Sequence, residues 1–275
     1  MKKSGLQRLL VVLFALAVCV PSLTGQQAAF PPTVSSQARA AADAPDSCAH
    51  LFTSGSNSTF LQYCVSDNGN ISSIQTPFQH PHSGGGGEGY GLCQESPAVE
   101  YHDYAVSNSG NWAAAQVLSA TNSAIKISRS TNDGNWTLVQ TITKVGLTSS
   151  IKVVMALTNN QSVAKVAYLL RFADVDANGN SSNWFVPGFE GVVGWDQVSA
   201  GPGPNYGLQL QNAGKTPFGY QQGFARAANY GPNACDFAAN SLGLIEYYDG
   251  SLAYVYAGPV PAQQTMTVTL SYRGL

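Results

Sequence analysis

From residue 112 onward, apolar and polar side chains alternate with a period of two, which is the pattern of a strand with one buried face. In one such segment Ile151, Val153 and Met155 share a face. The alternation predicts an antiparallel meander of five strands, at 112–118, 124–129, 136–143, 150–157 and 164–173.

Two Asp-Gly pairs predict tight turns, because both residue types tolerate a positive φ. Asp133-Gly134 lies between two strands of the meander. Asp249-Gly250 predicts a second hairpin near the end of the chain. The strands expected in this last part lie at 242–248, 252–257 and 265–273, and the hairpin joins the first two.

Signals for other structure are few. The strongest helix signal covers only two turns, over 221–229, and glycine and proline break longer attempts. Residues 79–91 include four consecutive glycines and are expected to form a long flexible loop. No repeat of about 20–50 residues is visible. The pattern therefore predicts an all-β fold, a large antiparallel β-sandwich with little helix, and a closed β-barrel is the alternative.

The first 25 residues have the order of a secretory signal peptide, with a basic start, an apolar run from Leu9 to Val20, and then small and polar residues. The run is shorter than the roughly 20 residues that span a bilayer, and an uncleaved anchor is the alternative. Residues 26–46 are expected to be a flexible leader and 47–275 a single β-sandwich domain. We therefore expect an exported protein (periplasmic, secreted or at the cell surface) with no membrane span once the signal is removed.

Four cysteines lie beyond the signal, an even number that suits a compartment where disulfides form. Cys48 and Cys64 are favoured as partners because they are near in sequence, which leaves Cys93 and Cys235 to join an early segment to a late one. The other two pairings stay open. A zinc site is disfavoured because the chain contains no CxxC pair.

Charged residues make up 10% of the chain, against about 25% in an average globular domain. The chain has 13 basic and 15 acidic residues, and three of the basic ones lie in the signal, so the mature balance is 10 to 15, or −5. No basic patch is visible, which disfavours nucleic-acid binding.

The segment from Asp174 to Asn180 alternates oxygen-bearing side chains and has a glycine at its sixth position. Such a loop suits Ca²⁺, which prefers oxygen ligands. The predicted ligands are Asp174, Asp176, Asn178 and Asn180. A full EF-hand is excluded because its twelfth position holds Phe185. The alternative is a polar turn whose side chains cap their own backbone.

Trp184, Trp195 and Tyr206 lie in segments rich in Gly, Pro and Asn. They are candidate sugar-binding residues, because aromatic rings pack on the C–H faces of sugars while amides bond the hydroxyls. Glu190 and Asp196 are the candidate catalytic pair, since glycoside chemistry uses two carboxylates about 5–10 Å apart. The alternative is that the rings seal the edges of the sandwich and the carboxylates are solvated.

The segments 129–138, 151–155 and 170–177 resemble secreted bacterial β-sandwich proteins, which are similar in layout to the galactose-mutarotase-like domains of carbohydrate-active enzymes. The resemblance covers roughly residues 60–275 and implies a concave sheet that binds sugar. The His and Glu pair of that class matches no defined motif here.

Together these features favour an exported protein that binds or processes carbohydrate, and they leave open whether it is an enzyme. The alternative is a structural or adhesive extracellular protein with no small-molecule site. A concave sheet lined by rings and carboxylates would favour the first reading, and two flat, covered sheets would favour the second.

Overall fold

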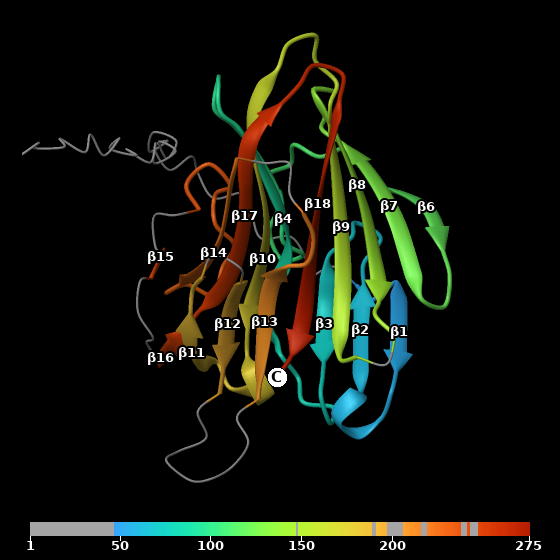
Figure 1. Cartoon of the computed structure of the whole chain (residues 1–275), viewed down its shortest axis with the longest axis vertical. Helices are drawn as coiled ribbons and strands as arrows, with labels where there is room; N and C mark the ends of the chain where they lie inside the picture. Colours follow the sequence, from blue (N-terminus) through green and yellow to red (C-terminus); the bar gives the residue numbers. More distant parts are fainter. Residues whose placement is uncertain are drawn as a thin grey trace, which may run out of the picture.

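The structure is a computed structural model, and it describes residues 47–146, 148–188, 191–196, 206–215, 219–237, 241–242 and 247–275. These residues form three antiparallel sheets and two short 3-10 turns, and none of the sheets closes on itself. The longer strands run along the long axis of the molecule (Figure 1). The expected signal peptide and leader, residues 1–46, lie outside the described residues.

The three-stranded sheet has the order β1 (His50–Ser54), β2 (Leu61–Val65) and β3 (Ile71–Gln75). The six-stranded sheet has the order β15 (Ser241–Leu242), β14 (Tyr220–Arg226), β17 (Ser251–Val260), β10 (Lys165–Val175), β4 (Ser83–Gln94) and β5 (Val99–Asp103). The nine-stranded sheet has the order β16 (Tyr247–Asp249), β11 (Ser182–Val186), β12 (Gly191–Trp195), β13 (Gly207–Asn212), β18 (Thr265–Gly274), β9 (Ser150–Asn159), β8 (Trp136–Lys144), β7 (Ala124–Ser130) and β6 (Gln116–Ala120). The 3-10 turns are η1 (Asn57–Thr59) and η2 (Ala177–Gly179).

The two large sheets share one hydrophobic core, as expected for a β-sandwich. Leu169 and Tyr254 of the six-stranded sheet and Val153 and Leu270 of the nine-stranded sheet belong to it and are fully buried. Tyr63 adds the three-stranded sheet to the same core. Each such side chain contributes roughly 1.5–3 kcal/mol by leaving water. The predicted all-β sandwich is therefore confirmed, and the barrel alternative is not formed by the described strands.

Two buried arginines cross this core, each paired with an acid. Arg171 donates to Glu88 through both Nε and Nη2, and Arg129 donates to Asp103 through Nη1. Glu88 also accepts a hydrogen bond of 2.6 Å from the Tyr272 hydroxyl on the facing sheet. Polar contacts thus join the sheets in the middle of an otherwise apolar interior.

The expectation of a flexible loop at 79–91 was wrong for most of that segment, because β4 is an inner strand between β10 and β5. Its glycines allow a backbone approach that a side chain would block. A Cβ on Gly86 would lie 1.3 Å from the Asn229 carbonyl oxygen, and one on Gly89 would lie 2.0 Å from that of Asp103. A strand built from glycine shows no alternation, so composition alone was misleading.

Two predicted connections were also wrong. The first four strands of the meander pair as expected (β6 to β9), but β10 lies in the other sheet. Asp249-Gly250 does not turn a hairpin: β16 pairs with β11, whereas β17 pairs with β10 and β14, so the chain crosses between the sheets at Gly250. Alternation indicates which face is buried but not which strand is the partner.

The helix predicted over 221–229 is not formed either, because β14 pairs along β17 from Tyr220 to Arg226. Tertiary pairing overrides a weak local preference of this kind.

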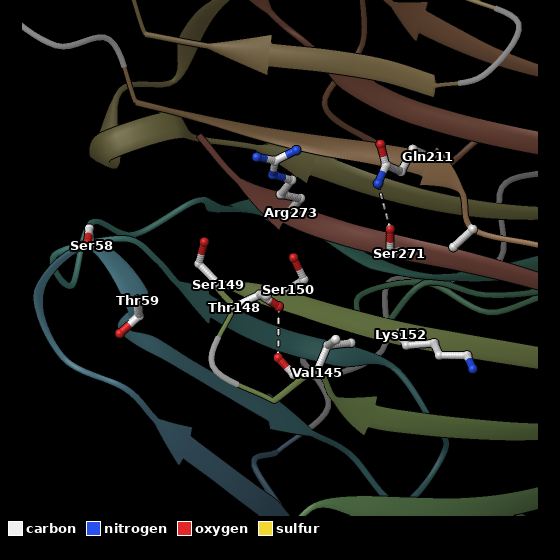
Figure 2. A pocket seen from close by; sticks show the side chains of 11 residues that line it. Ser58, Thr59, Val145, Thr148, Ser149, Ser150, Lys152, Gln211, Ser271 and Arg273 are labelled. Atoms are coloured by element: carbon white, nitrogen blue, oxygen red, sulfur yellow. Dashed lines mark hydrogen bonds between the residues drawn. The ribbon is translucent and has the colours of Figure 1, made fainter.

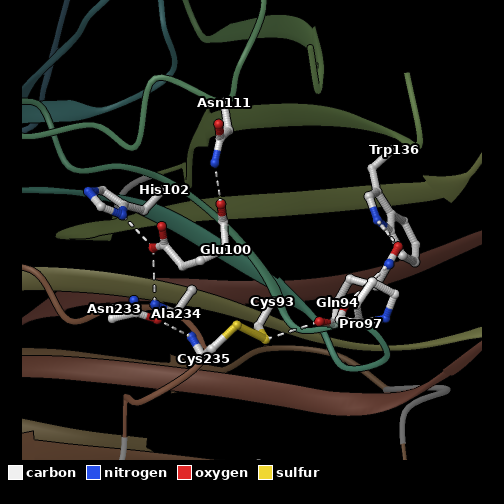
Figure 3. The surroundings of a disulfide bond; sticks show 10 residues. All are labelled: Cys93, Gln94, Pro97, Glu100, His102, Asn111, Trp136, Asn233, Ala234 and Cys235. Carbon is white, nitrogen blue, oxygen red and sulfur yellow. Dashed lines mark hydrogen bonds and ion pairs between the residues drawn. A yellow bond between two sulfur atoms is a disulfide. The ribbon is translucent and has the colours of Figure 1, made fainter. Parts of the chain in front are cut away.

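Two disulfides join segments around the sandwich, in the pairing favoured from the sequence. Cys48 and Cys64 have Cα atoms 5.4 Å apart, and Cys93 and Cys235 have Cα atoms 5.0 Å apart. The second bridge fastens a late segment to β4 and spans 142 residues (Figure 3).

Candidate functional site

The outer face of the nine-stranded sheet carries a cluster of aromatic side chains at one edge. Trp184 lies opposite both Trp195 and Tyr247 in the strand register of β12, β11 and β16. The ring centroids of Trp184 and Tyr247 are 5.9 Å apart. Both tryptophans are half-buried and Tyr247 is 54% exposed. We call these three residues the aromatic edge.

Two of the three sugar-binding candidates from the sequence therefore lie together. Tyr247 was missed because its segment showed only a strand and a turn. The register that places it beside Trp184 depends on pairing between residues more than sixty positions apart, which no local pattern contains.

Polar side chains continue along the same face. Gln209 and Gln211 of β13 lie opposite Arg273 and Ser271 of β18, and Ser271 lies opposite Lys152 of β9. Gln211 Nε2 donates to Ser271 Oγ over 3.1 Å (Figure 2). Neighbouring strands are about 4.8 Å apart, so the row from β12 to β18 extends about 10 Å.

All of these polar residues except Gln209 help to line a groove of about 500 Å³ between the sheet and the η1 segment (Figure 2). Its lining residues are Ser58, Thr59, Val145, Thr148, Ser149, Ser150, Lys152, Gln211, Ala213, Ser271 and Arg273. Hydroxyl, amide and cationic groups predominate, and none of these eleven residues carries a carboxylate. We call this the polar groove. Its groups suit hydrogen bonding to a neutral or anionic polyol.

Tyr206 and Asp196 lie elsewhere. Asp196 follows the outward-facing Trp195 by one residue and Tyr206 precedes Gly207, which is paired with Trp195, so both point to the opposite face. Asp196 is 1% exposed, and its two oxygens accept from Tyr206 N (2.6 Å) and Asn178 Nδ2 (3.0 Å). The Tyr206 ring stacks on His80, with centroids 3.5 Å apart. In this arrangement Asp196 organises the backbone beneath the aromatic edge. Its predicted partner, Glu190, lies outside the described residues.

The four predicted calcium ligands do not converge as a linear loop. One oxygen each of Asp174 and Asp176 comes within 4.8 Å of the other, together with one of Asp249. Asn178 instead contacts His80 Nδ1 (2.6 Å), and Asn180 is exposed. Asn178 Nδ2 donates to Asp196 Oδ2 over 3.0 Å, so the two ends of its amide bond His80 and Asp196 and not Asp174 or Asp176.

The pKa of Asp174 is raised to about 7, mainly because the carboxyl is buried and also because Asp176 and Asp249 repel its charge. The pKa of Asp176 is raised as well, by burial and by Asp249. Asp249 was missed as a ligand because its Asp-Gly pair predicted only a turn.

The outer face of the six-stranded sheet is covered where the second disulfide crosses it. Cys235 and Phe237 pack there against Tyr168, in a second hydrophobic cluster. Glu100 and His102 lie beside this cover and contact each other, and Glu100 also accepts from Ala234 N over 3.1 Å (Figure 3). The open face is therefore that of the nine-stranded sheet.

No protein-family model matches the sequence, and no curated protein matches it. A bacterial glucoamylase complexed with acarbose matches the structure with a TM-score of 0.56 at 9% identity. This likeness shows the fold. It covers 89% of this chain and 35% of the glucoamylase, so the chain spans about a third of that protein's length.

Galactose-mutarotase-like proteins are also among the structures with a similar layout. A putative aldose 1-epimerase from Escherichia coli K12 has a TM-score of 0.45 at 10% identity, covering 82% of this chain and 99% of that one. A galactose mutarotase-like protein from Lactobacillus casei ATCC 334 has a TM-score of 0.45 at 11% identity, covering 82% and 100%.

The described residues contain no helix that is long and apolar enough to cross a membrane.

Proposed function

We propose that this is an exported carbohydrate-binding protein that holds its ligand on the outer face of the nine-stranded sheet. The observation that carries the proposal is the aromatic edge: Trp184, Trp195 and Tyr247 come from three neighbouring strands and present partly exposed rings on one face. Aromatic faces of this kind bind the C–H faces of sugars.

The polar groove supports the same reading, because it lies on the same face and offers hydroxyl and amide groups to sugar hydroxyls. Lys152 and Arg273 extend the ligand class to sugars that carry acidic groups. Two disulfides suit an exported protein. The glucoamylase that shares the fold was seen with acarbose bound, which adds support of a general kind.

Binding is favoured over processing. Glycoside cleavage needs two carboxylates about 5–10 Å apart, and the described lining of the groove contains none. Of the candidate pair, Asp196 is buried with both oxygens occupied.

The test is a glycan array probed with the full oxidised chain, followed by calorimetric titration with the best oligosaccharide. Removing one ring should weaken binding about 10-fold or more, corresponding to about 1.4 kcal/mol, so Trp184→Ala and Trp195→Ala should each show this loss. Leu118→Ala is the control, because Leu118 is a 45% exposed apolar residue on β6, at the opposite edge of the nine-stranded sheet from the aromatic edge.

An array without binding, on protein shown to be folded, would refute the proposal and favour a structural or adhesive extracellular protein. Binding that survives both tryptophan substitutions would place the ligand elsewhere.

A further inference from the structure

Three aspartates meet at the place where the chain passes twice between the two large sheets, once after β10 and once before β17. Asp174 lies near the end of β10, Asp176 lies just beyond it, and Asp249 is the last residue of β16. One carboxylate oxygen from each comes within 4.8 Å of the others. We call them the aspartate triad. No Lys, Arg or His among the described residues forms an ion pair with any of them.

Two buried oxygens at this site have no hydrogen-bond partner. Asp174 is 3% exposed; its Oδ2 accepts from Gly86 N (2.6 Å), while its Oδ1 has no partner among the described residues. Ser251 lies directly opposite Asp174 in the register of β10 and β17, is fully buried, and has an Oγ without a partner. Side chains of directly opposed residues project from the same face, so this hydroxyl points toward the triad.

A backbone oxygen lies close by. A Cβ on Gly86 would lie 1.3 Å from the Asn229 carbonyl oxygen and 2.9 Å from Asp174 Oδ2, so the two oxygens are neighbours. The Asn229 side chain in turn donates to Asp249 Oδ2 over 2.9 Å. Arg226 is opposite Ser251 on the other side of β17, and its Nη1 donates to the Tyr230 carbonyl instead of to the triad.

A buried polar atom without a hydrogen-bond partner lowers the stability of the folded state, and a compact group of carboxylates without a cation lowers it further. The oxygens assembled here belong to three carboxylates, one hydroxyl and one carbonyl. Oxygen ligands alone, and several anionic ones, select a hard divalent cation, and Ca²⁺ accepts six to eight of them at irregular geometry.

We propose that the aspartate triad, with Ser251 Oγ and the Asn229 carbonyl, binds a calcium ion. This site differs from the linear loop expected from the sequence, because Asn178 and Asn180 are not ligands and Asp249 is. The ion joins β10 of one sheet to β16 of the other. The proposal involves different residues from the sugar-binding proposal, so either can fail without the other.

The test uses the full oxidised chain, treated with EGTA and then freed of it, and titrated calorimetrically with CaCl₂. One ion per chain should bind. Thermal unfolding should shift upward by about 5–10 °C when Ca²⁺ reaches about 100 times its dissociation constant. Asp249→Asn and Asp176→Asn should each abolish or strongly reduce the shift.

Two controls keep the result specific. Asp67→Asn removes a largely exposed carboxylate outside the triad and should retain the full shift. Asn180→Ala removes a ligand of the linear loop and should also retain it. Absence of binding heat and of any shift in the wild-type protein would overturn the proposal, and so would an unchanged response in Asp249→Asn. An equal response to MgCl₂ would overturn the assignment to calcium.

Discussion

The buried contact between Glu88 and Arg171 gives a demanding test of how the two sheets are held together. Glu88 is 3% exposed and Arg171 is fully buried. The Glu88 carboxylate accepts from two guanidinium nitrogens, from Ile71 N (2.5 Å) and from the Tyr272 hydroxyl (2.6 Å). The substitution Glu88→Gln keeps the shape of the side chain but removes its charge and replaces one acceptor with a donor.

The loss of stability in Glu88→Gln follows from the Arg171 charge that remains in the core. The Arg171 guanidinium stays in the core with only Gln140 Oε1 and the Gly69 carbonyl as further acceptors. Breaking a buried pair by removing one charge costs about 3–5 kcal/mol. For a domain of this size 1 kcal/mol corresponds to about 2–4 °C, so the melting temperature should fall by roughly 6–20 °C.

Urea unfolding followed by tryptophan fluorescence measures this directly, because Trp112 and Trp136 are buried. Glu95→Gln makes the same chemical change at a partly exposed position and should alter the unfolding free energy by no more than about 0.5 kcal/mol. The double variant Glu88→Leu with Arg171→Met should be less destabilised than Glu88→Gln, because it leaves no unpaired charge. A loss below about 1 kcal/mol in Glu88→Gln would refute this account of the core.

Two further predictions concern other parts of the molecule. In metal-free protein the pKa of Asp174 is raised to about 7 from an ordinary 3.8. Between these two pH values the folded state holds a proton that the unfolded state has released. Its contribution to stability is complete below pH 3.8 and is lost as pH rises through 7, by no more than about 4 kcal/mol, and Asp174→Asn should remove this dependence in urea unfolding at pH 5 and pH 8. Non-reducing peptide mapping should recover one fragment that links Cys93 to Cys235, and the variant Cys93→Ala with Cys235→Ala should lose about 4–5 kcal/mol, because the bridge closes a loop of 142 residues. Recovery of either cysteine linked elsewhere would contradict the pairing.

The sequence allowed the fold class and most strands to be predicted, because alternation reports burial directly. Residues 150–157 and 265–273 became β9 and β18 with the expected inner faces. Alternation could not assign β10 to its sheet. Much of β10 is buried on both faces, between the shared core and the second cluster, and its partners lie far away in the sequence.

The candidate sites show the same limit. Trp184 and Trp195 could be chosen from their surroundings, yet Tyr247 enters the aromatic edge only through the register of β11 and β16. Asp174 was identified from its loop, whereas Ser251 joins it only through the pairing of β10 with β17. Local composition indicates which residues are suited to a ligand, and long-range register decides which of them meet.

The short strand β16 has a consequence for how ligands would influence each other. Tyr247 and Asp249 are alternate residues of this three-residue strand, and Gly250 alone separates it from β17. An ion bound at Asp249 would stabilise the position of β16, and the Tyr247 ring would be held in place with it. If the ion raises the affinity for a sugar on that ring, thermodynamic reciprocity requires that the sugar raise the affinity for the ion by the same factor. The two proposed sites would then form one cooperative unit, with β16 as the element that transmits the coupling.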